Sequence, residues 1–84
     1  MFQPVFDGEN FSYFYEEETE RYLLIRKDEK IHIILKDEDA RSFQEYIAMI
    51  NSEPFTNIKE RTEKAIRILF HFHHSCPIPN FIEL

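Results

Sequence analysis

The stretch that decides the fold is "RYLLIRKDEKIHIIL", residues 21–35. Two runs rich in Ile and Leu flank a tight turn around Asp28 and Glu29, which predicts two strands joined by a short link. In the second run His32 and Ile34 point one way, and the other face carries Ile31, Ile33 and Leu35. Strands with so short a link are antiparallel neighbours, because a parallel pair needs a long crossover.

The residues before this stretch extend the same sheet. "FQPVF", residues 2–6, is a short extended segment that Pro4 restricts to a sheet edge, and Asp7-Gly8 is a turn signal. "FSYFYEE", residues 11–17, carries aromatic side chains at period two, which favours a strand with one well-buried face. We therefore expect an antiparallel meander of three to four strands over residues 2–36.

After Lys36 the apolar period becomes helical. Three acids at residues 37–39 complement a helix N-terminus, and an apolar stripe follows, formed by Ala40, Phe43, Ile47 and Ile50. Pro54 ends this segment, so a helix is predicted over residues 37–51.

A second helix is predicted over residues 57–74. Asn57 and Glu60 match a capping box at its start, and Pro77 and Pro79 forbid its continuation. One face is expected to be buried and carries Ile58, Thr62, Ala65, Ile66, Leu69 and His73. The opposite, solvated face carries Glu60, Glu63, Lys64, Arg67, His71 and His74. An extended tail over residues 75–84 completes a single α+β domain, residues 1–84, of ββββαα order with both helices on one face of the sheet.

The composition is that of a small folded protein. The chain has 84 residues, 43% of them hydrophobic, with nine Phe, four Tyr and one Gly, whereas disordered segments carry few aromatic residues. The single cysteine, Cys76, cannot form a disulfide within the chain, which favours a reducing, cytoplasmic location. The start resembles no signal peptide, and no apolar run is long enough to cross a bilayer, so we expect a soluble protein without membrane contact.

The net charge of −6 lies entirely in the first twenty residues, which carry six acids and no base. The rest of the chain is balanced, with ten acids against ten bases. Without a basic stripe, direct nucleic-acid binding is disfavoured, while a basic protein partner would be steered toward the acidic end.

The cluster "HFHHSC", residues 71–76, is the clearest candidate for chemistry. His71 and His74 share a helix face and Cys76 follows, so these three side chains are candidate zinc ligands. The simpler interpretation is that His71 and His74 continue the solvated face, where a cationic histidine is favourable near a helix C-terminus. Cys76 lies at the end of the helix dipole that disfavours a thiolate, so we expect no catalytic thiol. A single glycine also excludes a glycine-rich phosphate loop.

The sequence therefore predicts a non-enzymatic protein-interaction module without a cofactor, and two surfaces are candidates. The acidic-aromatic hairpin would bind a partner through Tyr13, Phe14 and Tyr15, with Glu16, Glu17, Glu18 and Glu20 orienting a basic protein. The strongly apolar end of the second helix predicts a homodimer interface at Ile68, Phe70 and Phe72. Alternatively, Phe2, Phe14 and Phe81 bury one another, so that the far face of the sheet is not an interface. The other functions considered are metal binding at the His/Cys cluster and inhibition by acidic mimicry of a nucleic acid.

Overall fold

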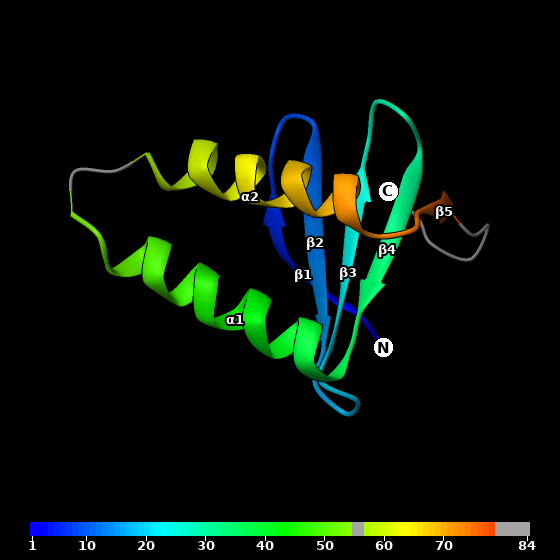
Figure 1. Ribbon diagram of the computed structural model, residues 1–84, viewed down its shortest axis with the longest axis horizontal. Coiled ribbons are helices and arrows are strands. Elements are labelled where there is room, and N and C mark those ends of the chain that lie inside the picture. Colours follow the sequence, from blue (N-terminus) through cyan, green and yellow to red (C-terminus); the bar gives the residue numbers. More distant parts are fainter. Residues whose placement is uncertain (55–56, 79–84) are drawn as a thin grey trace.

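The computed structural model describes residues 1–54 and 57–78. Four strands, β1 (Gln3–Asp7), β2 (Phe11–Glu16), β3 (Arg21–Arg26) and β4 (Ile31–Leu35), precede helices α1 (Asp37–Ser52) and α2 (Ile58–Phe72). A two-residue strand, β5 (Cys76–Pro77), follows α2 and pairs with β4. The sheet has the order β1-β2-β3-β4-β5 and every neighbouring pair is antiparallel (Figure 1). The predicted α+β meander followed by two helices is confirmed.

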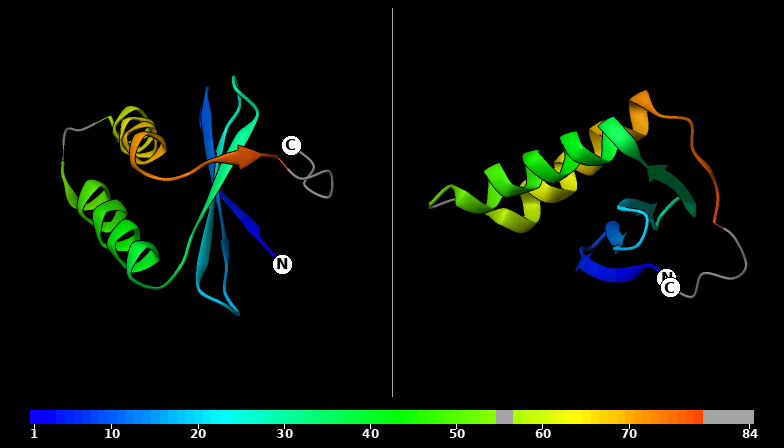
Figure 2. Two further views of the ribbon diagram at one scale, coloured as in Figure 1. Left: turned by 45° about the vertical axis from the view of Figure 1, so that its right-hand side comes forward. Right: turned by 90° about the horizontal axis from the view of Figure 1, so that it is seen from below.

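Both helices cover the same face of the sheet, as the edge-on view in Figure 2 shows. α1 begins at the predicted residue and ends at Ser52. α2 is shorter than predicted and ends at Phe72, where the extended backbone of His73 caps it and the His73 N–H donates to the Leu69 carbonyl. The chain then leaves the helical layer and passes along the edge of β4. β5 therefore lies within the segment that the sequence predicts to be an extended tail. The part of that tail containing Phe81 lies outside the described residues.

The core between sheet and helices is largely aromatic. The rings of Tyr13 and Tyr22, on β2 and β3, lie edge-on to Phe43 of α1, with centroids 5.1 and 5.0 Å away. Edge-to-face pairs contribute roughly 0.5–1.5 kcal/mol beyond the area they bury. Period-two aromatics on the strands therefore meet the helical stripe of α1 directly, which sets the helical layer on this face.

The opposite face of the sheet is largely closed within the chain. Leu23 and Ile25 point away from the helices and are 1% and 0% exposed. Ile34, beside Leu23 in the neighbouring strand, is 44% exposed. The apolar surface that the sequence left open on this face is thus reduced to Ile34 on β4 and the half-buried Phe14 on β2.

An unexpected contact holds α2 to the loop between β1 and β2. The Glu63 carboxylate accepts hydrogen bonds from the backbone N–H groups of Asn10 and Phe11, at 2.9 and 3.4 Å. The same oxygen, Oε1, lies 2.2 Å from where a Cβ on Gly8 would be. The sequence placed Glu63 on the solvated face of the second helix, which is wrong, because this carboxylate satisfies loop backbone that the strands leave unpaired. Gly8 provides the room for it.

No helix in the described part of the chain is both long and apolar enough to cross a membrane.

Candidate protein-docking surface

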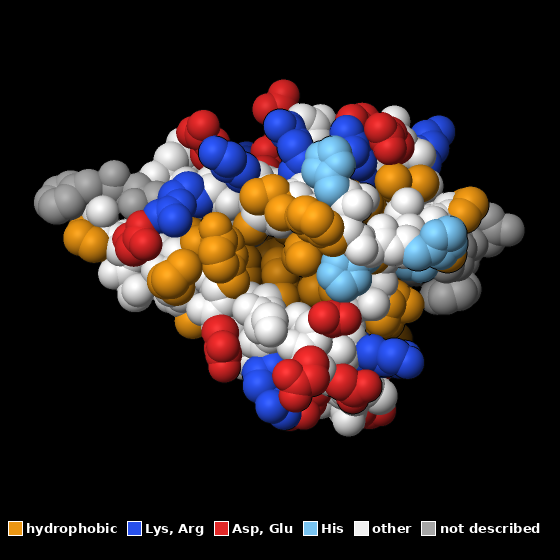
Figure 3. Space-filling view, viewed as in Figure 1, with side chains coloured by type: hydrophobic (Ala, Val, Ile, Leu, Met, Phe, Trp, Pro, Cys, Tyr) orange, Lys and Arg blue, Asp and Glu red, His pale blue; other side chains and the backbone are white. Residues whose placement is uncertain are grey.

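A groove runs along the outer side of the helical layer, between α1 and α2. Its volume is about 290 Å³, and Figure 3 shows hydrophobic side chains gathered around a hollow between the two helices. Residues from both helices line it: Asp39, Ser42, Phe43 and Tyr46 from α1, and Ala65, Ile68, Leu69 and His73 from α2 and its cap. We call this surface the helix groove.

The packing of the two helices explains the groove. At the end nearest the α1–α2 connection, the helices are held together by an ion pair between Glu53, which follows α1, and Arg61 of α2. The Glu53 carboxylate raises the pKa of Arg61 above its usual range, because it stabilises the guanidinium form. At the other end the helices diverge, and the wall residues there are Asp39 and His73. Phe43 lies at the floor of the groove and packs against the aromatic core below it.

Large hydrophobic side chains remain exposed on the outer surface of both helices. Tyr46 and Met49 of α1 are 40% and 48% exposed, and Ile58, Ile68 and Phe72 of α2 are 42%, 46% and 81% exposed. Tyr46 and Ile68 also line the helix groove, one on each wall. Isolated exposed hydrophobic residues are ordinary, whereas exposed hydrophobic residues gathered at one depression are typical of interaction sites.

The residues predicted to form a dimer interface divide between the groove and the core. Ile68 lines the helix groove and Phe72 is exposed at the end of α2. Phe70 instead turns toward the sheet, where its ring lies 6.0 Å from that of Phe11. Two of the three predicted residues are therefore accessible to a partner in this fold.

Charge differs on the two sides of the groove. The α1 segment carries four acids and one base, whereas α2 carries four Lys or Arg residues and two acids. Figure 3 shows mainly Asp and Glu side chains below the groove, on the α1 side, and Lys and Arg side chains interspersed with acidic ones above it, on the α2 side. The apolar depression thus separates an acidic helix from a basic one.

The open end of the groove carries three polar side chains. Asp39, Ser42 and His73 include the residue types of a hydrolytic triad. Within residues 1–54 and 57–78, however, no hydrogen bond joins any two of these side chains. In this structure the three residues form the polar rim of an apolar groove.

The N-terminal hairpin is arranged differently from the surface predicted for it. Tyr13 is 6% exposed and lies in the core, while Phe14 and Tyr15 are half-buried. Glu17, Glu18 and Glu20 are exposed in the turn between β2 and β3. The hairpin therefore presents its acids without Tyr13 as an aromatic anchor.

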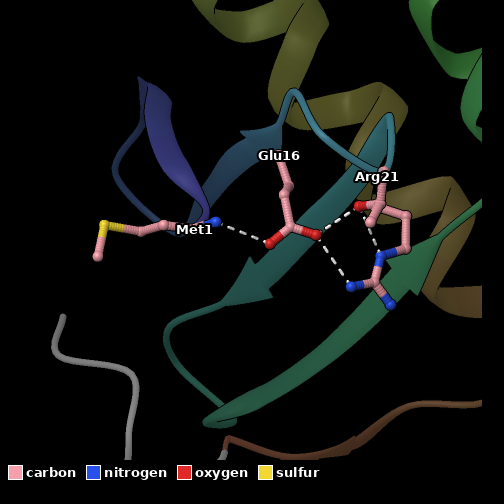
Figure 4. Close-up of polar contacts among 4 residues, drawn as sticks. Met1, Glu16 and Arg21 are labelled. Carbon is pink, nitrogen blue, oxygen red and sulfur yellow. Dashed lines mark hydrogen bonds and ion pairs between the residues drawn. The ribbon is translucent and has the colours of Figure 1, made fainter.

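Glu16 is bound within the chain. Its carboxylate accepts hydrogen bonds from the Thr19 hydroxyl, from the Met1 ammonium at 2.9 Å and from the Arg21 guanidinium at 2.9 Å (Figure 4). These donors, with Thr19 making the largest contribution, lower the pKa of Glu16 to about 2. Because these donors already bind the Glu16 carboxylate within the chain, it contributes little to the attraction of a basic partner.

The six N-terminal acids do not form one surface. Asp7 and Glu9 lie at the β1–β2 end of the hairpin, and the others lie at the β2–β3 end. Asp7 is also engaged, because it accepts hydrogen bonds from Lys27 and Ser12, which lower its pKa. A nucleic-acid mimic needs a continuous negative surface, and this distribution does not favour one.

The His/Cys cluster is spread along the chain as it leaves α2. His71, His74 and Cys76 are all exposed, and the Cys76 backbone carbonyl lies 3.0 Å from Nδ1 of His32. In the part of the chain that the structure describes, no group of three or more His, Cys, Asp or Glu residues is placed to hold a metal. The extended backbone from His73 onward separates the three candidate ligands, and zinc binding by them stays a prediction.

Comparisons with protein-family models, with curated proteins and with solved structures find no match to this chain. The helix groove is therefore identified as a candidate site from its geometry alone. Sequence reasoning missed Tyr46 and Met49, which lie beside the predicted stripe of α1. The signal that pointed nearest to the groove was the excess of apolar residues around the end of the second helix.

Proposed function

We propose that this protein is a non-enzymatic protein-interaction module that binds an amphipathic helix in the helix groove. The observation that carries the proposal is an apolar depression between the two helices whose walls include the exposed side chains of Tyr46 and Ile68, 40% and 46% exposed. Grooves between two helices are common docking sites for the apolar face of a third. The homodimer predicted from the end of α2 is one form of such an interaction, because Ile68 lines the groove and Phe72 is exposed at the end of the same helix.

The chemistry of the groove suits a helix better than a small polar ligand. Its walls are aliphatic and aromatic, and its polar residues, Asp39, Ser42 and His73, lie at the open end. The groove also follows the helices lengthwise, so side chains spaced three and four residues apart on a bound helix would enter it in sequence. Charges on both sides would set the direction of the bound helix.

The exposed acids of the β2–β3 turn are a separate element of the proposal. Glu17, Glu18 and Glu20 are free of ion pairs within the described chain. They would steer a basic partner toward the molecule without contributing the apolar contact area, which the helix groove provides.

Selection from a displayed library of helical peptides tests the docking function. Peptides enriched on the wild-type protein are labelled, and their dissociation constants are measured by fluorescence anisotropy. We expect apolar residues at i, i+4 and i+7 in the enriched peptides, and binding at least about tenfold weaker to Ile68→Glu, since a buried unpaired carboxylate costs more than 1.4 kcal/mol.

Val5→Glu is the matched control, because Val5 is 56% exposed on edge strand β1, away from the groove. It should bind the peptides as the wild type does. Peptides that bind Ile68→Glu and wild type equally, or a selection that enriches none, would contradict the proposed docking site. Circular dichroism of each variant confirms that the fold is intact.

A further inference from the structure

We infer that the helix groove is covered by a second copy of the same chain, related by a two-fold axis that runs along the groove. In this arrangement α1 of one copy lies antiparallel on α2 of its partner, and the exposed apolar side chains of the two copies bury each other. The inference rests on the proposed docking function of the groove and names its occupant.

The first reason is that this surface is complementary to itself. α1 and α2 run in opposite directions on the two sides of the groove (Figure 1). Rotation by half a turn about an axis along the groove exchanges the two sides and keeps each helix direction, so acidic α1 faces basic α2 twice. An axis across the groove would place acidic α1 on acidic α1, and like charges in an interface are strongly unfavourable. The charge distribution therefore selects one of the two face-to-face dimers.

The second reason is a pair of charges that lack partners within the chain. Glu45 and Lys64 are both exposed, and in the described part of the structure neither forms an ion pair or a hydrogen bond. Glu45 follows Ser42 by one turn and Lys64 precedes Ile68 by one turn, so each lies on the same helix face as a groove-lining residue. Each therefore borders the groove on its own side.

These two residues also lie at corresponding levels. The ion pair between Glu53 and Arg61 joins the helices at one end, and Asp39 and His73 mark the other. The middle of α1, at Glu45, is thus level with the segment from Lys64 to Ile68. The proposed axis preserves this level, so Glu45 of one copy comes within reach of Lys64 of the other, and the symmetry makes the contact twice.

The third reason is that exposed hydrophobic side chains lie at corresponding levels on the two helices. On the exposed surface of the helical layer, Tyr46 of one copy would lie opposite Ile68 of the other, and the symmetry makes this contact twice. Each of these side chains is 40% exposed or more in the single chain. Aromatic side chains are also enriched at such interfaces.

Charge reversal with rescue tests the arrangement. Sedimentation equilibrium gives the dimer dissociation constant of the wild type, of Glu45→Lys, of Lys64→Glu and of the double variant. We expect the wild type to be a dimer. Each single variant should have a dimer dissociation constant at least about tenfold higher, because like charges then meet twice. The double variant should recover most of the wild-type affinity. Glu9→Lys, with the same charge change in the exposed β1–β2 loop away from the groove, should leave the dimer unchanged.

Each other result overturns the inference in a recognisable way. Single variants that dimerise as the wild type does would place the interface elsewhere, and a double variant as weak as the singles would refute the Glu45–Lys64 pairing. A wild type that is monomeric at high micromolar concentration refutes the second copy as occupant. If that monomer still binds the selected helical peptides through Ile68, the docking function stands, and if it binds none, both proposals fail.

Discussion

Replacement of Glu63 by alanine removes the contact that joins α2 to the β1–β2 loop. In the native fold its carboxylate accepts from the Asn10 N–H at 2.9 Å and from the Phe11 N–H at 3.4 Å. These groups are separated by 53 and 52 residues in the sequence, so the contact closes the fold between its first hairpin and its last helix. The alanine side chain would leave both amide groups partly buried without this acceptor.

The expected loss of stability follows from the hydrogen-bond geometry. A hydrogen bond to a charged group contributes roughly 1.5–3 kcal/mol. The contact at 3.4 Å is longer than the usual N–H···O range, so we count only the one at 2.9 Å in full. Glu63→Ala should therefore lower the free energy of unfolding by about 2 kcal/mol, which for a domain of this size lowers Tm by roughly 10 °C.

Urea denaturation followed by circular dichroism measures this change. All variants are compared at one protein concentration, because self-association adds to apparent stability. Glu18→Ala is the control, since it removes the same charge from an exposed turn residue and should change stability by less than about 0.5 kcal/mol. Hydrogen exchange should also show reduced protection of the Asn10 and Phe11 amides in Glu63→Ala alone. Equal stability of the two variants, with unchanged protection, would refute the role given to Glu63.

Three further outcomes follow from the same structure. Gly8→Ala should destabilise by about 1–3 kcal/mol, because its Cβ would lie 2.2 Å from Oε1 of Glu63 and 2.9 Å from the Phe11 carbonyl; adding Glu63→Ala should not restore stability, since the carbonyl clash remains. Asn57→Ala should cost about 1 kcal/mol in a urea titration, because its side chain caps α2. For Glu16, the folded pKa of about 2 lies below the ordinary 4.5, so its contribution is complete above pH 4.5 and is lost as the pH falls toward 2. The stability difference between wild type and Glu16→Gln should shrink over that range, and a difference independent of pH would contradict the stabilising role of the ionised Glu16.

The four-stranded meander and both helices could be predicted from local sequence patterns. The aromatic alternation at Tyr13 and Tyr15, the short link around Asp28 and the stripe through Phe43 each depend on side-chain periodicity, which a chain carries in one dimension. Short links permit only antiparallel neighbours, so the strand order also followed. The cap at Asn57 was predictable for the same reason, because a helix start depends on a few adjacent residues.

The end of the second helix and the role of Glu63 were not predictable in this way. α2 ends at Phe72, before the prolines, because the chain must turn there to reach the edge of β4. Glu63 has the helical position of a solvated residue, and only the arrival of the β1–β2 loop beside it makes it an acceptor for buried backbone. Both depend on elements distant in sequence.

The same division holds for the proposed site. By itself the sequence determined that apolar residues around Ile68 and Phe72 exceed what one sheet face can cover. It placed the binding aromatics in the hairpin, but tertiary packing buried Tyr13 against Phe43. Only the packing of α1 and α2, joined at one end and diverging at the other, put Tyr46 and Ile68 on the two walls of one groove. Periodicity states which face of a helix is apolar, whereas the space between two helices is a property of their relative placement, which only the tertiary structure decides.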